Sequence, residues 1–153
     1  MQRFEGKVAI VSGAGPGVGS LVSLMLAQEG ANVCIGARTS SRLQALAKEI
    51  EAIGREALVV PTDITKPKDA KNIADQTFER FGKIDILINN AFSAGPRKPV
   101  VEYTEDEMER WRAAIDSAGY GTMLMCHYAA PYMIQLGQGA IVNVSSMSSR
   151  TGY

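Results

Sequence analysis

The residues Ser12–Gly19 form a glycine-rich segment between a short apolar run and a helical pattern. Glycines at such a strand–helix junction let the backbone approach a pyrophosphate, whose negative charge then lies at the positive end of the helix. A plain tight turn needs fewer glycines, and no Gly-Lys-Ser/Thr follows, which argues against a phosphate-loop NTPase. The predicted phosphate-binding residues are Gly13, Gly15, Pro16, Gly17, Val18 and Gly19.

A second candidate phosphate contact follows the next apolar run, at Arg38 and Thr39. A carboxylate at this place would hydrogen-bond the adenosine ribose of a dinucleotide and repel a 2′-phosphate, and this sequence has none there. Arg38 can bind a phosphate through paired hydrogen bonds, and the Thr39 hydroxyl adds a donor. The pattern favours NADP(H) as the cofactor and leaves NAD(H) possible. The alternative is that Arg38 is a solvated loop residue.

The elements that must position these residues alternate regularly along the chain. Strands are expected at residues 7–12, 31–37, 57–61, 85–89 and 140–145, and helices at 17–28, 41–53, 68–81 and 105–136. Gly119, Gly121 and Pro131 are expected to bend or interrupt the last helix.

This alternation predicts the fold class. Strands separated by helices need crossover connections, which favour a parallel sheet covered on both faces. The near-continuous apolar strands agree, because a parallel strand is buried on both sides. We therefore predict one α/β domain over residues 1–153, a Rossmann-type doubly wound parallel sheet in three α/β/α layers.

The spacing Gly13-x-x-x-Gly17-x-Gly19 resembles the glycine pattern of the short-chain dehydrogenases/reductases. Further landmarks of that family occur in the correct order, and the resemblance covers essentially the whole chain. They are Gly6-Lys7-Val8-Ala9, Asp63-Ile64, Asn89-Asn90-Ala91 and Ile141-Val142-Asn143-Val144-Ser145-Ser146. The resemblance implies an oxidoreductase that transfers hydride between a nicotinamide and a carbonyl or secondary alcohol of a small-molecule substrate.

The resemblance also implies roles for residues at the strand ends. Asp63, with Ile64 beside it, would face the adenine amino group, although Asp63 could instead cap the next helix. Asn90 and Ala91 would lie near the cofactor, with Ala91 passing the ribose. Asn89 and Asn90 would also tie neighbouring strands together at the carboxyl edge of the sheet.

In that family a serine, a tyrosine and a lysine carry out the chemistry. Ser146 matches the serine that polarises the carbonyl, with Ser145, Ser148 and Ser149 as alternatives. Tyr153 comes too early to be the proton donor, and no Tyr-x-x-x-Lys pair follows Ser146. We therefore expect a fragment that ends after the fifth strand, or part of a longer polypeptide. The alternative function is a non-catalytic dinucleotide-binding module or an inactive fragment.

Two residues depart from the pattern of the family. Ala118 stands where the central helix often has an asparagine that helps to hold a proton-relay water, so that relay is rerouted or missing. Phe92 stands where Asn-Asn-Ala-Gly would have glycine, which would reshape the wall near the nicotinamide.

The composition limits other function classes. The formal net charge is zero, so no electrostatic argument favours nucleic acid or an anionic membrane as a partner. No apolar run reaches membrane-spanning length and the N-terminus lacks a signal-peptide pattern, so a cytoplasmic protein is expected. Cys34 and Cys126 are expected to be reduced and buried, and neither they nor His127 have metal-ligand spacing, so no metal site is expected. Trp111 is expected to pack a helix against the core. The resemblance implies that the central helix forms part of a dimer or tetramer interface, so a homo-oligomer contact is expected there. Helical packing alone would also explain the methionines of this helix, Met123, Met125 and Met133.

Overall fold

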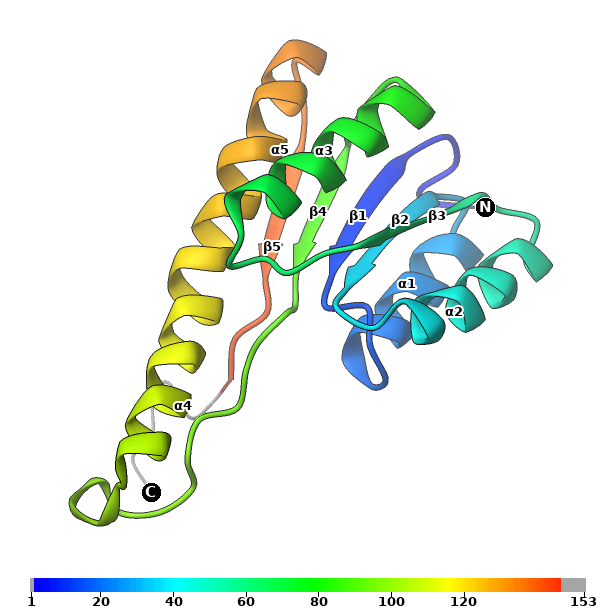
Figure 1. Cartoon of the computed structure of the whole chain (residues 1–153). Helices are drawn as coiled ribbons and strands as arrows, with labels where there is room; N and C mark the ends of the chain where they lie inside the picture. The colour runs from blue at the N-terminus through cyan, green and yellow to red at the C-terminus, as the bar shows by residue number, and fades with distance from the viewer. Residues whose placement is uncertain (1, 147–153) are drawn as a thin grey trace.

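The computed structural model describes residues 2–146 (Figure 1). Five strands form one sheet in the order β3-β2-β1-β4-β5, and every neighbouring pair is parallel. The strands are β1 (Val8–Ser12), β2 (Asn32–Ala37), β3 (Ala57–Pro61), β4 (Ile86–Asn89) and β5 (Ala140–Asn143). Because the chain runs from β1 outward to β3 and then returns to the other side of β1, the topological switch point lies between β1 and β4.

Helices cover both faces of the sheet, as predicted. One apolar cluster joins β1, β2 and β4 to α1 (Val18–Gln28) and α2 (Ser40–Ala52). A second cluster joins the opposite face to α3 (Pro67–Phe81) and α5 (Thr122–Leu136). The alternation of side chains along β1 explains the division, because Val11 belongs to the first cluster and Ile10 to the second. The expected Rossmann-type three-layer arrangement is confirmed.

The amino ends of the central strands are tied together by Asp85, whose side chain is 3% exposed. Its carboxylate accepts hydrogen bonds from the Val8 backbone N–H at 2.9 Å and from Lys7 Nζ at 3.0 Å. Lys83 Nζ lies 3.3 Å from the second carboxylate oxygen. Burial by itself raises the pKa of Asp85, but the Lys7 and Val8 hydrogen bonds and the two positive charges outweigh it and hold the pKa below its ordinary value.

The expected long helix is divided into three parts. α4 (Glu105–Ile115) is followed by a π-helical segment, Asp116–Gly121, and then by α5. Pro131 does not interrupt the helix, since α5 continues through it. Pro131 lies on the exposed side of the helix, where water can replace the lost backbone hydrogen bond. Packing explains why residue 121 is a glycine, because a Cβ at this position would lie 2.6 Å from Ile64 Cδ1.

The end of the molecule that carries α4 is exposed. In Figure 1, α4 and the segment before it extend past the carboxyl ends of the strands. Every side chain of α4 is at least partly exposed, and Trp111 is 51% exposed, so the prediction that Trp111 packs on the core is wrong. α4 begins with a capping box between Thr104 and Glu107. Hydrogen bonds from Lys98 and the Thr104 backbone lower the pKa of Glu107 to about 2.

β5 is the edge strand of the described sheet on the side of α5. Its pairing with β4 places Asn89 opposite Asn143. All four residues of β5 are exposed, Ile141 by 40% and Val142 by 49%. Among the described residues this edge of the sheet is therefore exposed, in contrast with β1, where all five residues are buried.

Candidate dinucleotide site

The glycine-rich segment after β1 is fixed to the ends of both neighbouring strands. On the β2 side, the Gly36 carbonyl oxygen accepts the backbone N–H groups of Gly13 at 2.7 Å and of Ala14 at 3.1 Å. On the β4 side, Asn90 Nδ2 donates to the Gly13 carbonyl oxygen at 2.9 Å, and the Asn90 N–H donates to the Ser12 carbonyl oxygen at 3.2 Å. The segment is thus held at the switch point, where open α/β sheets bind their ligands.

Gly13, Gly17 and Gly19 each have a reason to lack a side chain. A Cβ on Gly13 would lie 2.5 Å from the Ala91 backbone, and a Cβ on Gly19 would lie 2.0 Å from the Gly13 carbonyl oxygen. Gly17 has a φ of 105°, which favours glycine. A Cβ on Gly15, in contrast, would meet no heavy atom of the described chain within 4 Å. Gly13 and Gly19 therefore close the packing around the segment, while Gly15 faces open space.

The amino end of α1 completes a cradle for an anion. α1 begins at Val18, next to Pro16 and Gly17, and within the described residues its N-cap receives no side-chain hydrogen bond. Its first turn holds no acidic residue. The partial positive charge of the helix end is therefore uncompensated by side chains, and the open space at Gly15 lies in the same segment. These residues fit the pyrophosphate of a dinucleotide.

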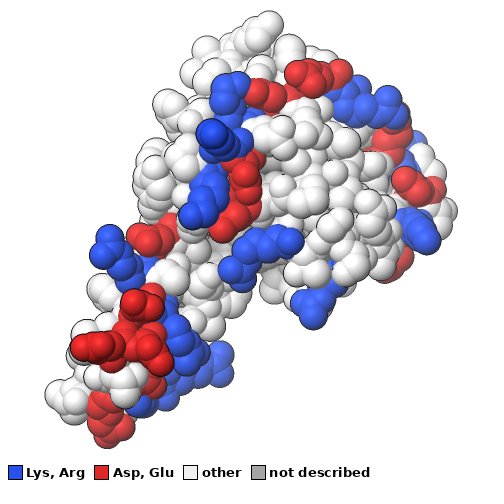
Figure 2. Space-filling view, in the orientation of Figure 1, with Lys and Arg blue, Asp and Glu red and all other residues white. Residues whose placement is uncertain are grey.

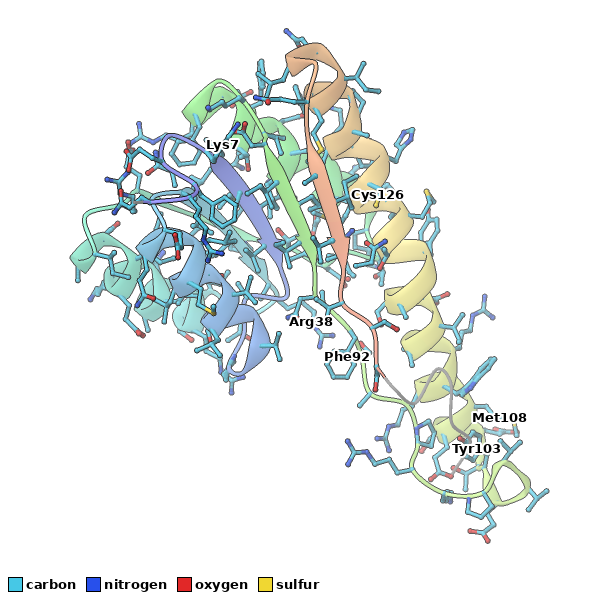
Figure 3. The ribbon with its side chains drawn as sticks, turned by 180° about the vertical axis from the view of Figure 1, so that it is seen from behind. Lys7, Arg38, Phe92, Tyr103, Met108 and Cys126 are labelled. Atoms are coloured by element: carbon cyan, nitrogen blue, oxygen red, sulfur yellow. The ribbon has the colours of Figure 1, made fainter. Side chains whose placement is uncertain are left out.

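Arg38 and Thr39 follow β2 at the same edge of the sheet. Both side chains are exposed, and Thr39 is the N-cap residue of α2 without a side-chain cap bond in the described structure. Arg38 lies close enough to Asp63 for its positive charge to act on that carboxylate. Figure 3 shows Arg38 at the carboxyl ends of the strands, the end at which Phe92 also lies.

Asp63 forms a local turn after β3 instead of capping α3. Its Oδ1 accepts the Thr65 N–H at 3.0 Å and the Thr65 hydroxyl at 2.7 Å, while the N-cap residue of α3 is Lys66. The alternative interpretation of Asp63 as a helix cap is therefore wrong. Burial raises the pKa of Asp63, but the Thr65 hydrogen bonds and the charges of Lys66 and Arg38 hold it below its ordinary value. Asp63 is thus an ionised acceptor near the end of β3.

Ile64 and Ala91 lie in the segments that follow β3 and β4 at the carboxyl edge of the sheet. Ile64 is 6% exposed and packs in the core beside Gly121 of the π-helical segment. Ala91 is half-buried and its backbone passes directly over Gly13. Ile64 therefore positions the turn that carries Asp63, and Ala91 lies against the glycine-rich segment.

The segment that carries Ser145 and Ser146 follows β5, which is joined to β4 by a hydrogen bond between two asparagines at the carboxyl edge of the sheet. Asn89 Nδ2 donates to Asn143 Oδ1 at 2.9 Å, across the pairing of β4 with β5. Ser145 and Ser146 follow directly and are exposed. The structural role expected for Asn89 is confirmed by this contact. Ser148, Ser149 and Tyr153 lie outside the described residues.

Two contacts that hold the site were missed by the sequence reasoning. The Gly36 carbonyl oxygen carries the glycine-rich segment, and a Cβ on Gly36 would lie 2.5 Å from Ile73 Cδ1. The buried Ser117 hydroxyl accepts the Ser93 N–H at 2.8 Å. A glycine inside an apolar strand was a signal for the first, whereas nothing in the sequence pairs Ser93 with Ser117.

The cysteines differ in their burial and in their distance from this edge. Burial raises the pKa of Cys34 to about 12, whereas Cys126 is only half-buried, so its expected burial is wrong. Cys126 lies 3.4 Å from Asn89 Nδ2, at the position labelled in Figure 3. Within residues 2–146 no group of three or more His, Cys, Asp or Glu side chains is placed to hold a metal ion. No helix in that range is long and apolar enough to cross a bilayer.

The family model of the short chain dehydrogenases matches residues 7–153. The chain belongs to the short-chain dehydrogenase family. A relative in Acinetobacter baylyi, 1,6-dihydroxycyclohexa-2,4-diene-1-carboxylate dehydrogenase, is 38% identical over 149 residues, 97% of this chain and 56% of that protein. Cyclohexanol dehydrogenase of an Acinetobacter strain is 32% identical and matches 98% of this chain and 59% of its own length. The chain thus spans little more than half of the curated relatives that it matches.

Solved structures of this family have the same fold. NAD⁺-bound xylitol dehydrogenase superposes with a TM-score of 0.92 at 30% identity, over 99% of this chain and 57% of the other. A 7α-hydroxysteroid dehydrogenase complexed with NADH and 7-oxo glycochenodeoxycholic acid gives 0.90 at 29% identity, over 99% and 58%. Relatives of this chain therefore include NAD(H)-binding oxidoreductases that act on small molecules.

Proposed function

We propose that the whole protein is an NADP(H)-dependent oxidoreductase that acts on a carbonyl or secondary alcohol of a small molecule. The observation that carries this proposal is the open cradle at the switch point, formed by the glycine-rich segment and the amino end of α1. A bound nicotinamide dinucleotide would supply the hydride donor or acceptor. Residues 1–153 would form one dinucleotide-binding domain.

The residues of the site would each bind a different part of the dinucleotide or the substrate. The backbone of Gly13–Gly19 would bind the pyrophosphate. Asp63, ionised and fixed by Thr65, would accept a hydrogen bond from the adenine amino group. Asn90 and Ala91 would line the passage toward the nicotinamide, and Ser146 would donate its hydroxyl to the substrate oxygen.

The preference for NADP(H) rests on the residues after β2. Arg38 is exposed at the edge where an adenosine ribose would lie, and the nearby acidic side chain, Asp63, follows β3 instead of β2. A guanidinium there attracts a 2′-phosphate and can bind it with two hydrogen bonds. The structural neighbours described above hold NAD⁺ or NADH, so this preference is argued from this chain alone.

Fluorescence titration of the Arg38→Asp variant with NADPH and NADH tests the preference. We expect the wild-type chain to bind NADPH more tightly, and the variant to lose about tenfold or more in NADPH affinity because a carboxylate repels the 2′-phosphate. Lys48→Asp, at an exposed position in the second half of α2, is the matched charge control. Equal affinities of the wild type for both dinucleotides, unchanged in Arg38→Asp, would contradict this interpretation of Arg38.

A second candidate function is dinucleotide binding without hydride transfer. The two candidate functions differ in whether the whole protein supplies a tyrosine–lysine pair to act with Ser146. A polypeptide of these 153 residues alone would then bind the dinucleotide and show no turnover. An intact mass above 16.4 kDa together with activity on alcohols or carbonyls would favour the enzyme.

We also propose that the protein forms a homo-oligomer through α4. Met108, Trp111 and Ile115 make an exposed apolar stripe on this helix, beside a cavity of about 670 Å³ that Tyr103 also lines (Figure 3). Acidic side chains gather at the start of α4 (Figure 2), whereas Arg110 and Arg112 lie in its second half. An antiparallel second copy would place opposite charges side by side around the apolar stripe.

A further inference from the structure

Phe92 is an exposed aromatic side chain at the edge of the proposed cofactor site. It follows Ala91, whose backbone passes within the volume that a Cβ on Gly13 would occupy. The side chain of Phe92 is 74% exposed, although phenylalanine gains most from burial. Figure 3 shows it where the chain leaves the carboxyl end of β4, away from both apolar clusters of the core.

The backbone on both sides of Phe92 is fixed. Before it, Asn90 binds Ser12 and Gly13 through its N–H and its side-chain amide. After it, the Ser93 N–H donates to the buried Ser117 hydroxyl at 2.8 Å, and that hydroxyl donates to the Ala114 carbonyl oxygen at 3.0 Å. The exposed ring of Phe92 therefore belongs to a segment whose backbone is fixed by hydrogen bonds. An aromatic ring at the edge of a proposed ligand site is suited to line that site.

The strand order indicates which half of a dinucleotide Phe92 would meet. Arg38 and Asp63 follow β2 and β3, on one side of the glycine-rich segment, and they would hold the adenosine half. Phe92 follows β4, on the other side of β1. A dinucleotide whose pyrophosphate lies at the glycine-rich segment would extend its nicotinamide half toward β4 and β5.

We infer that Phe92 contacts the nicotinamide half of the bound dinucleotide and shields it from water. This inference rests on the proposed dinucleotide site. The contact is between a phenyl ring and a planar heteroaromatic ring with its ribose, a pairing that adds affinity beyond simple area burial. Phe92 thereby determines affinity for the half of the cofactor that reacts, while the adenosine half is bound independently of it.

The test compares whole and half cofactors on one set of variants of the 153-residue chain. Phe92→Ala, Phe92→Tyr and the wild type are titrated with NADPH and NADH, and with adenosine 2′,5′-bisphosphate and AMP as the matching adenosine halves. Ile134→Ala is the matched control. Ile134 is 78% exposed, close to the 74% of Phe92, but it lies near the end of α5, just before β5 begins, at the opposite end of the sheet from the proposed site. Quenching of bound NADPH fluorescence by acrylamide reports the access of water to the nicotinamide.

We expect Phe92→Ala to weaken binding of the tighter dinucleotide by about three- to tenfold and to increase acrylamide quenching. Binding of the adenosine half should be unchanged, and Phe92→Tyr and Ile134→Ala should resemble the wild type. If Phe92→Ala binds the dinucleotide as the wild type does, or loses equally on the adenosine half, the inference is overturned while the site stands. If the folded wild type binds neither dinucleotide, the proposed function itself fails.

Discussion

The central strands and the α4 end of the molecule differ in how their apolar side chains are covered. All residues of β1 are buried, and helices pack on both faces of it. In α4 every side chain is at least partly exposed, including Met108, Trp111 and Ile115. The difference teaches that the first region gains its stability from packing among the described residues, whereas the apolar surface of the second is not covered by them.

The largest expected effect on stability lies at Gly19, in the glycine-rich segment that follows the central strand β1. A Cβ there would lie 2.0 Å from the Gly13 carbonyl oxygen and 2.8 Å from Asn90 Nδ2, so Gly19→Ala must displace the glycine-rich segment. We expect the free energy of unfolding to fall by about 3 kcal/mol, measured by urea denaturation. Gly15→Ala is the control, because its Cβ meets open space, and its unfolding free energy should stay within about 0.5 kcal/mol of the wild type. Equal losses in both variants would contradict the packing described for Gly19.

The next effect concerns Asp85, which ties the amino ends of β1 and β4. Asp85→Asn removes the charge that Lys7 and Lys83 face, and we expect a loss of about 2 kcal/mol at pH 7. The folded-state pKa of Asp85 is lowered, so its stabilisation is fully present above the unfolded pKa of about 4 and is lost as the pH falls through the folded value. The gap between wild type and variant should therefore narrow below about pH 4 in urea titrations from pH 3 to pH 7. A gap that is constant over this range would show that the charge of Asp85 is not its source.

The smallest effect on stability is expected in the second region. Trp111→Glu changes a side chain that is 51% exposed, so the unfolding free energy of dilute protein should change by less than about 0.5 kcal/mol. The same variant should abolish concentration-dependent association in sedimentation equilibrium, because a carboxylate would enter the proposed apolar contact. Ile134→Glu, on the exposed side of α5, should leave association unchanged. A large loss of unfolding free energy in Trp111→Glu at low protein concentration would contradict the difference described between the two regions.

The sequence predicted the first region well and the second poorly, for a physical reason. Apolar runs bounded by glycine and proline specify buried strands, and the observed strands begin and end within two residues of those expected. The helical period of residues 105–136 specified a helix, but it does not reveal a π-helical segment of only six residues, Asp116–Gly121, and it does not show which face of α4 is covered. Trp111 was therefore misplaced.

The candidate site shows the same limit. The glycine-rich segment was recognisable because strand, glycines and helix are adjacent in the sequence. Contacts between distant segments, such as Ser117 with Ser93 or the Gly36 carbonyl oxygen with Gly13, depend on the packing of the sheet. Asp63 was open to two interpretations, and only the observed turn with Thr65 separated them. The roles of Arg38 and Ser146 stay predictions.

Equilibrium titration of the wild type and Gly15→Ala with NADPH and NADH tests the central claim most directly. The cradle predicts saturable binding to the wild type and a loss of about tenfold or more in Gly15→Ala, since its Cβ would enter the space proposed for the pyrophosphate while the fold is unchanged. A folded wild type that binds neither dinucleotide would contradict a dinucleotide site at the junction of β1 and β4, whereas a Gly15→Ala variant that binds as tightly as the wild type would show that Gly15 does not face the pyrophosphate.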